Sequence, residues 1–315
     1  TGFAVVRPKP TELVPGFCKY ALREPGFLAQ IEMRSVGISY PAINASDLAA
    51  IPICTPPIPQ QHAIAHYLDR EVARIDGLVA AKERVLALMA EKRKALIARA
   101  VTRGLNPKAP LRDSGITWLG TAPGHWEPYR IAALFCERDE RGESDLPLLE
   151  VSINQGVVLR EFSDERIEGT AADFNTYKVA RRGDIVFNKM RMWQGAAGVA
   201  PTDGLVSPDY TVAVSNGKMV PEYAGLLFRT DMFSAECARH SHGIVWDRMR
   251  LYWEGFREIV VPVLSINEQR AIVAHIAAET GKLDALQMAT ERTIALLKER
   301  RAALISAAVT GQLAV

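Results

Sequence analysis

The sequence predicts a chain of the α/β (α+β) class, built from one mixed α/β domain and two long helices that form an antiparallel coiled coil. Three observations lead to this prediction. A stretch of 48 residues occurs twice, and both copies have the composition and apolar spacing of a continuous helix. The intervening stretch of about 160 residues has the size of one domain and is rich in Gly and in strand-forming segments.

The repeat relates Ile58–Leu105 to Ile266–Leu313 at a constant offset of 208 residues without a gap. About twenty of the paired positions are identical, including Gln61 with Gln269. The last turns agree as well, because Ala-Val-Thr closes both copies, at 100–102 and at 308–310. Chance does not produce a match of this length, so the two copies are expected to fold alike.

Each copy is predicted to be one helix, beginning near Gln60 and near Asn267. Both are rich in Ala, Leu, Glu, Lys and Arg, and both lack Pro from these residues onward. At about 1.5 Å per residue, some 44 residues extend over roughly 65 Å, which is too long for the core of one globular domain. A strand-like segment containing Pro precedes each helix, at 51–53 and at 259–263.

Apolar residues in both helices recur at steps of three and four, which is the spacing of a coiled-coil seam. Polar residues interrupt this seam at matching places, by Lys82 and Thr290 and again by Arg93 and Arg301. The alternative is two separate amphipathic helices on separate domains, but matched interruptions favour mutual pairing. Two equivalent helices that share one interface are related by an approximate two-fold axis, and with their globular ends opposed they run antiparallel. We expect the following residues to be buried between them: Leu86, Met89, Leu96, Ile294, Leu297 and Leu304.

Composition places the chain among ordinary globular proteins and gives no direct sign of a partner. Its 315 residues are 48% hydrophobic and 23% charged, with a formal net charge of +2. A nucleic-acid partner would therefore have to meet a local basic surface. No apolar run is long enough to span a membrane and no signal sequence is present, so a cytoplasmic protein is expected. The four cysteines are far apart and are expected to be reduced and mostly buried.

The motifs of several enzyme classes are absent. The sequence has neither a phosphate-binding loop nor a Gly-x-Gly-x-x-Gly motif, and Ser207–Tyr210 matches the adenine-methyltransferase motif poorly. Asp184 precedes Lys189 without the second acid that a nuclease requires. His62 and His66 are spaced for a shared metal but lack a third ligand, so surface histidines are the preferred interpretation. We therefore expect no catalytic residue, no metal ligand and no cofactor.

The stretch Gly183–Gly198 is the best candidate for a binding site. It predicts a turn, a buried strand, a loop in which cations alternate with large apolar residues, and a Gly-containing return. Cations interleaved with aromatic and amide groups suit contact with phosphates and base edges. Met190, Met192 and Trp193 could instead belong to the core, with the cations on a solvated face. The candidate DNA-binding residues are Lys189, Arg191, Trp193, Gln194, Arg181, Arg182, His240, His242, Arg248 and Arg250.

The chain resembles the specificity (S) subunit of type I restriction-modification systems, in a form truncated at its N-terminus. Three sets of residues carry the resemblance: Asp113–Gly120 with Pro123–Glu127, Gly183–Gly198 with Gly204–Tyr210, and the helix entries Ile58–Gln61 and Ile266–Gln269. In that family, two target-recognition domains alternate with two long conserved helices that pack as an antiparallel coiled coil. Each domain reads one half of a split DNA site.

The resemblance implies four regions. Residues 1–57 would be the C-terminal remnant of a first target-recognition domain, 58–105 the first conserved helix, 106–265 a complete target-recognition domain and 266–315 the second conserved helix. The remnant is expected to leave apolar segments such as Phe27-Leu28 and Ile51–Ile53 poorly covered. The implied partners are double-stranded DNA, methyltransferase (M) subunits, through them the restriction (R) subunit, and a second copy of the truncated chain, with no membrane.

Two other functions are considered. A coiled-coil scaffold whose domain binds protein would have the same helices but would not bind DNA. An autonomous nuclease would need catalytic residues that the sequence lacks.

Overall fold

The computed structural model describes residues 5–37, 41–160, 174–243 and 249–315. The chain divides into two compact units, one of Thr1–Ala90 with Asp284–Val315 and the other of Glu91–Leu283. Two long helices, α4 (Ile58–Arg103) and α8 (Ile266–Val309), each contribute one part to either unit. The helix starts predicted near Gln60 and Asn267 are therefore confirmed to within two residues.

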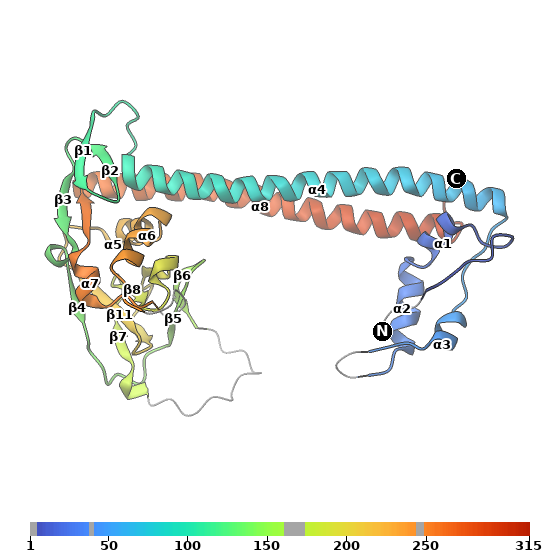
Figure 1. Cartoon of the computed structure of the whole chain (residues 1–315), viewed down its shortest axis with the longest axis horizontal. Coiled ribbons are helices and arrows are strands. Elements are labelled where there is room, and N and C mark those ends of the chain that lie inside the picture. Colours follow the sequence, from blue (N-terminus) through green and yellow to red (C-terminus); the bar gives the residue numbers. More distant parts are fainter. Residues whose placement is uncertain (1–4, 38–40, 161–173, 244–248) are drawn as a thin grey trace. The chain divides into compact units, whose positions relative to one another are not determined.

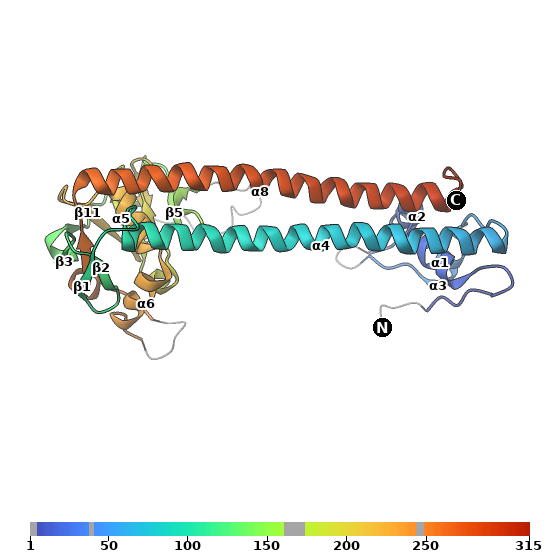
Figure 2. The ribbon, with the colours of Figure 1, turned by 90° about the horizontal axis from the view of Figure 1, so that it is seen from above.

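In each unit the two helices run side by side in opposite directions (Figure 1 and Figure 2). In the first unit, Asp76 pairs with Arg301 at 2.9 Å and Glu83 with Lys298 at 3.6 Å, so residue numbers rise along one helix and fall along the other. In the second, the Arg93 guanidinium donates to the Thr280 carbonyl at 3.4 Å. The predicted antiparallel pairing is confirmed in both units.

The expected burial along the seam is only partly correct. Of the six residues predicted to be buried, Ile294 is 8% exposed, whereas Leu86, Met89, Leu96, Leu297 and Leu304 are half-buried. The reason is geometric, because a pair of helices encloses a side chain from one side only. Leu96 and Leu304 also pack against the cores of their units and are still only partly covered. The polar Thr290 is buried at the seam, where its hydroxyl donates to the Leu286 carbonyl one turn earlier.

The first unit adds three short helices to the helix pair: α1 (Pro15–Ala21), α2 (Pro25–Arg34) and α3 (Ala45–Ala49). Both α1 and α2 begin with Pro, whose fixed φ and missing N–H suit the first turn of a helix. The core packs α1 against both long helices and consists of Val14, Phe17, Tyr20, Ala21, Ile64, Ala65, Leu68, Val72, Ile305, Ala308 and Val309.

A buried glutamine holds α1 to α4. The side chain of Gln61 is 1% exposed, and its Oε1 accepts from the Val14 N–H at 2.7 Å. Its Nε2 donates to the carbonyls of Glu12 at 2.9 Å and Pro56 at 2.7 Å. These bonds satisfy the amide and fix the chain on both sides of the three short helices.

Two expectations about residues 1–57 are corrected by the structure. The first, that two apolar segments are poorly covered, is wrong for Phe27 and Ile51, which are buried because α2 and the segment after α3 pack within the first unit. Leu28 and Pro52 are exposed, as expected, and Ile53 is half-buried. Residues 51–53 form no strand, whereas the equivalent segment forms β12 (Val260–Val263). The difference arises because β12 pairs with β3 (Glu127–Arg130), and the described part of the first unit offers no such partner to 51–53.

The second unit contains all the described strands, and each pair of neighbouring strands is antiparallel. A four-stranded sheet has the order β4-β11-β8-β9, formed by Phe135–Arg138, Tyr210–Ser215, Ile185–Asn188 and Ala197–Val199. Two-stranded pairs join β1 (Leu111–Ile116) to β2 (Gly120–Pro123), β5 (Leu149–Ser152) to β6 (Gly156–Leu159), β7 (Lys178–Ala180) to β10 (Gly204–Val206), and β3 to β12.

Three helices pack with these strands: α5 (Pro221–Phe228), α6 (Asp231–Arg239) and α7 (Trp253–Glu258). Their aromatic side chains form the centre of the core, where the rings of Phe228 and Phe233 stack at 4.7 Å and those of Phe187 and Phe256 lie 4.6 Å apart. The predicted mixed α/β fold between the two long helices is therefore confirmed.

The second unit repeats the glutamine contact of the first. Gln269 is fully buried, and its Oε1 accepts from the Val220 N–H at 2.7 Å. Its Nε2 donates to the carbonyls of Lys218 and Leu264 at 3.0 and 2.8 Å. Val220 precedes the Pro at the start of α5, as Val14 precedes the Pro at the start of α1. The internal repeat thus extends beyond the long helices to the helix that each of them binds.

Candidate nucleic-acid interface

The loop 189–195 follows the buried strand β8 and is held by a core anchor. Met192 is fully buried in the short 3-10 helix η3 (Met192–Gln194), and Gly195 closes the loop at a positive φ of 82°. Because Met192 is fixed in the core, its neighbours Arg191 and Gln194 face solvent. The predicted order of turn, buried strand, loop and Gly-containing return is confirmed, and the return forms β9. Of the three large apolar residues only Met192 is fully buried.

Lys189 lies half-buried at the start of this loop. Its Nζ is 5.9 Å from the centroid of the Tyr252 ring, a distance at which a cation and an aromatic face attract each other. Burial lowers the pKa of Lys189, and the positive charge of Lys178 lowers it further. Lys178 is itself buried, with its Nζ 3.5 Å from Glu137 and 3.4 Å from Asp139.

A second segment brings two more predicted residues beside Lys189. The backbones of His242 and Arg250 are bonded to each other at 3.0 and 2.9 Å, and the next residue, Leu251, donates its N–H to the Lys189 carbonyl at 2.9 Å. The Arg250 guanidinium lies 4.0 Å from Asp209. Arg248 is outside the described residues, so only the sequence supports that candidate.

A hollow of about 480 Å³ lies between η3 and α6. Trp193 and Gln194 form one wall, and the other is formed by residues of α6 that include Ser234, Ala235 and Arg239. The Trp193 indole N–H donates to the Met190 carbonyl at 3.0 Å, which fixes the ring within the loop. Arg239 was not among the predicted site residues.

Near the last turn of α6, one buried carboxylate contacts an arginine and a histidine. Glu236 is 8% exposed and accepts from Arg239 Nη1 at 3.0 Å. Its other oxygen lies 3.3 Å from Nε2 of His240, a predicted site residue. The sequence signal for this group was the i, i+3 and i, i+4 spacing of Glu236 to Arg239 and His240, which places all three on one helix face.

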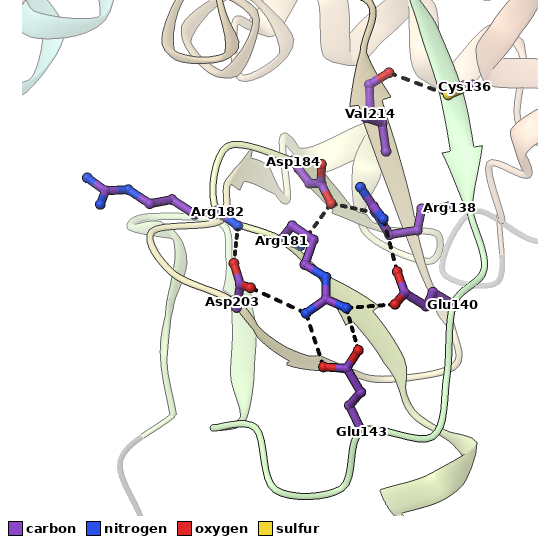
Figure 3. A network of polar contacts seen from close by, with 9 residues as sticks. All are labelled: Cys136, Arg138, Glu140, Glu143, Arg181, Arg182, Asp184, Asp203 and Val214. Atoms are coloured by element: carbon purple, nitrogen blue, oxygen red, sulfur yellow. Dashed lines mark hydrogen bonds and ion pairs between the residues drawn. The ribbon is translucent and has the colours of Figure 1, made fainter.

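Arg181 lies at the opposite end of β8 in a network of carboxylates (Figure 3). Its guanidinium binds Glu140 at 2.6 Å, Asp203 at 3.3 Å and Glu143. The hydrogen bond that Arg181 donates to Glu143 is the largest cause of its raised pKa, followed by the one that it donates to Glu140. The structure therefore separates Arg181 from the loop 189–195 and occupies both of its terminal nitrogens with acids.

Arg182 belongs to the same turn but is not neutralised in the same way. Its backbone N–H donates to Asp203 at 2.8 Å, while its side chain is exposed and points away from the carboxylates in Figure 3. Asp184 is 5% exposed and accepts from Arg138 Nε at 2.9 Å and the Arg181 N–H at 2.8 Å. Asp184 thus fixes the turn at the start of β8.

Within the described residues, no group of three or more His, Cys, Asp or Glu side chains is arranged to hold a metal ion. His62 and His66 are exposed on α4, as the surface interpretation requires. All four cysteines are free, but the expectation that most are buried is wrong, because Cys54 and Cys136 are exposed. None of the described helices combines the length and apolar character needed to cross a membrane.

Solved structures that resemble this chain agree on one fold. No protein-family profile matches the sequence, and no curated protein matches it either. A chain from a structure described as the "complex assembly and conformational transition of the type I R-M system" is 18% identical, with a TM-score of 0.72 over 98% of this chain and 74% of that one. The HsdS subunit from Thermoanaerobacter tengcongensis is 20% identical, with a TM-score of 0.53 over 99% of this chain and 74% of that one. The chain therefore has the fold of the HsdS subunits of type I restriction-modification systems.

Proposed function

We propose that this protein is the DNA-recognition (specificity) subunit of a type I restriction-modification complex and reads one half of a split DNA site. The observation that carries the proposal is the likeness to type I restriction-modification structures over 98% of the chain. The cationic loop 189–195 supports it, because a subunit of this kind needs exposed donors for phosphates and base edges. The protein would recognise the target sequence and would have no catalytic activity of its own.

The proposed DNA-binding residues fall into three groups. Lys189, His242 and Arg250 form the first group, in which Lys189 contacts phosphate. Arg191, Trp193 and Gln194 form the second and face the bases, and we add His240, which follows α6 and contacts Glu236. Arg182 remains as a separate cation, Arg248 is proposed from the sequence alone, and Arg181 is left out because three carboxylates neutralise it.

The domain assignment extends the same proposal. Residues 106–265 form the complete target-recognition domain, and 58–105 and 266–315 are the conserved helices. We assign residues 1–57 to the C-terminal part of a first target-recognition domain, because the Gln61 contacts and the core around α1 repeat those of Gln269 and α5.

Exposed leucines at repeat-related positions support the docking of methyltransferase subunits. Leu78 and Leu286, which match in the repeat, are 46% and 53% exposed, and the matching pair Leu88 and Leu296 is 57% and 56% exposed. Exposed apolar side chains at equivalent places suit two copies of one partner. We place the methyltransferase subunits at these leucines and the restriction subunit on the methyltransferase subunits. A second copy of this chain is a further proposed partner.

Replacing Leu88 or Leu296 by Asp tests the docking surface. Each single variant should lose about half of the methyltransferase bound per chain, and the double variant should lose nearly all of it, as measured by light scattering of the co-purified complex. Replacing the exposed Arg74 by Asp, also on α4, is the control and should bind normally. Full binding by the double variant would contradict the assignment.

A titration of the full chain with duplex DNA over a range of salt concentrations separates the proposal from its competitors. Binding that weakens steeply with salt is expected, because bound phosphates release counterions. A protein-binding scaffold would show no shift, and a nuclease would cleave plasmid in the presence of Mg²⁺. If the chain does not bind duplex DNA at low salt, either alone or with methyltransferase subunits, the proposal is wrong.

Lys189 and Arg191 should respond differently in this titration. Lys189→Ala should weaken binding about equally for all sequences and reduce the salt slope by about 1, as expected for a phosphate contact. Arg191→Ala should instead relax the preference at one base pair by roughly 1–3 kcal/mol. Lys218→Ala is the matched control, since Lys218 also lies over a tyrosine ring, 5.4 Å from Tyr129.

A further inference from the structure

The hollow between η3 and α6 contains an arginine that is already held in one orientation. Arg239 Nη1 donates to the buried Glu236 at 3.0 Å, yet the Arg239 side chain is 65% exposed. Among the described residues, its Nη1 bond to Glu236 is the hydrogen bond that the guanidinium makes, and its Nε and Nη2 make none. The edge of the guanidinium formed by these two nitrogens is therefore available, and an arginine can bond guanine O6 and N7 through such a fork.

The buried carboxylate of Glu236 is not a requirement of the helix itself. In the first unit, α2 occupies the position of α6 after the repeated Val-Pro helix, and it has Gln30 and Met33 where α6 has Glu236 and Arg239. Burying a carboxylate is unfavourable unless it is paired. Since α2 folds without the pair, the pair is explained better by what it orients than by the stability of the helix.

Arg181 shows what an arginine with only a structural role looks like in this domain. Both of its terminal nitrogens are bound, one by Glu143 and Asp203 and the other by Glu140 and Glu143. Arg239 uses one nitrogen and leaves the others to the hollow, beside Trp193 and Gln194. Holding the side chain in advance lowers the conformational entropy that is lost on binding.

We propose that Arg239 reads a base edge, with guanine as the preferred base, and that Glu236 is its positioning residue. This inference rests on the proposed DNA recognition and adds a specificity-determining residue to it. Gln194, on the opposite wall of the hollow, would contact the adjacent base.

The test is a binding selection with the full chain in complex with its methyltransferase subunits, using a pool of duplexes with a randomised segment. The sequences that wild type enriches define the half-site. Arg239→Ala should lose the preference at one base pair by roughly 10- to 100-fold and keep the others. Arg239→Lys should not restore it, because an ammonium group cannot form the fork.

The positioning role of Glu236 has its own readout. Glu236→Gln should weaken the preference at the same base pair by less than Arg239→Ala does, and the double variant should lose no more than Arg239→Ala alone. The matched control is Arg74→Ala on α4, because Arg74 also forms an i, i+3 pair, with Glu71 at 3.9 Å. Circular dichroism checks folding, and Arg239→Gln takes the place of Arg239→Ala if the latter does not fold.

The possible results separate this inference from the function on which it rests. If wild type enriches no sequence, the proposed DNA recognition fails. If wild type enriches a half-site and Arg239→Ala leaves every preference unchanged, or weakens all duplexes equally, base reading by Arg239 is overturned and DNA recognition stands. Loss at a different base pair in Glu236→Gln would overturn the positioning role.

Discussion

The segments Val14–Met33 and Val220–Arg239 begin alike and end differently. Each opens with Val-Pro at the start of a helix, and each Val N–H donates to a buried glutamine at 2.7 Å. In each, a side chain caps the next helix by accepting the N–H of a buried Phe, Glu24 for Phe27 and Thr230 for Phe233. In both units, therefore, the first helix is bound to a long helix through a glutamine, and the second helix begins with a capped, buried Phe.

The difference lies at two matching positions of the second helices, α6 and α2. In the second unit, η3 lies beside α6. On α6, the buried Glu236 forms an ion pair with the exposed Arg239. On α2, the matching positions hold Gln30 and Met33, and Met33 is 71% exposed. The shared contacts of Val and Phe therefore attach these helices to the long helices in both units. The exposed residues at the end of the second helix differ between the units.

The shared contacts should differ in strength because the two cores differ in aromatic content. Phe233→Ala should lower the free energy of unfolding of the second unit by about 3–5 kcal/mol, since Phe233 is fully buried and stacks on Phe228. Phe27→Ala should cost the first unit less, about 3 kcal/mol, because Phe27 is 7% exposed. Hydrogen exchange of the amides in each unit measures both. An equal loss in the two variants would show that the aromatic stack adds nothing.

The two glutamines should be equivalent. Gln269→Ala and Gln61→Ala each remove three hydrogen bonds of a buried amide, at about 1 kcal/mol each, so each variant should lose about 3 kcal/mol. Protection from exchange should fall around α5 in the first variant and around α1 in the second. The neighbouring Gln60 is exposed, and Gln60→Ala serves as the control. A loss in only one unit would break the equivalence.

The smallest effect is expected for Arg181, whose partners lie at the surface. Its bond to Glu140 lowers the pKa of that carboxyl, and the backbone N–H of Arg182 lowers the pKa of Asp203. Carboxylates with lowered pKa values contribute stability above their ordinary pKa, near pH 4, and lose it as pH falls through the folded value.

Thermal unfolding from pH 7 to pH 3 tests this sign. Arg181→Ala should unfold at a slightly lower temperature than wild type at pH 7, and the difference should shrink below about pH 4, where the carboxylates are protonated. DNA binding by the variant should remain normal, since Arg181 is not placed at the interface. A difference that grows on acidification, or a loss of DNA binding, would contradict this view of Arg181.

The sequence predicted the long helices well because their signal lies in the order of residues along the chain. The three- and four-residue spacing that includes Leu68, Val72 and Ile75 and the repeat at 208 residues set both the helix type and the pairing. It also showed that Gln61 and Gln269 are equivalent. It did not show why, since their acceptors at Glu12 and Lys218 lie 49 and 51 residues away along the chain.

The candidate site was harder to predict, because charge on its own does not say which cations are available. Arg181 and Lys189 flank the same strand and are equally plausible from the sequence. Folding brings three acids that are 22 to 41 residues away into contact with Arg181: Glu140, Glu143 and Asp203. Lys189 lies instead over the ring of Tyr252. Arg239 and Glu236 had a readable spacing but no sign that one would be buried and the other exposed.

The sequence by itself therefore determined the two helices, their antiparallel pairing and the mixed domain between them, because periodicity and repetition can be recognised in the order of residues without knowing which distant side chains meet. Only the tertiary structure decided that Arg181 is neutralised by acids, that Arg239 is held in one orientation by Glu236, and which apolar residues stay exposed. Each of these outcomes depends on side chains that are distant in the sequence and meet only when the chain is folded, where burial and ion pairing act over a few ångströms.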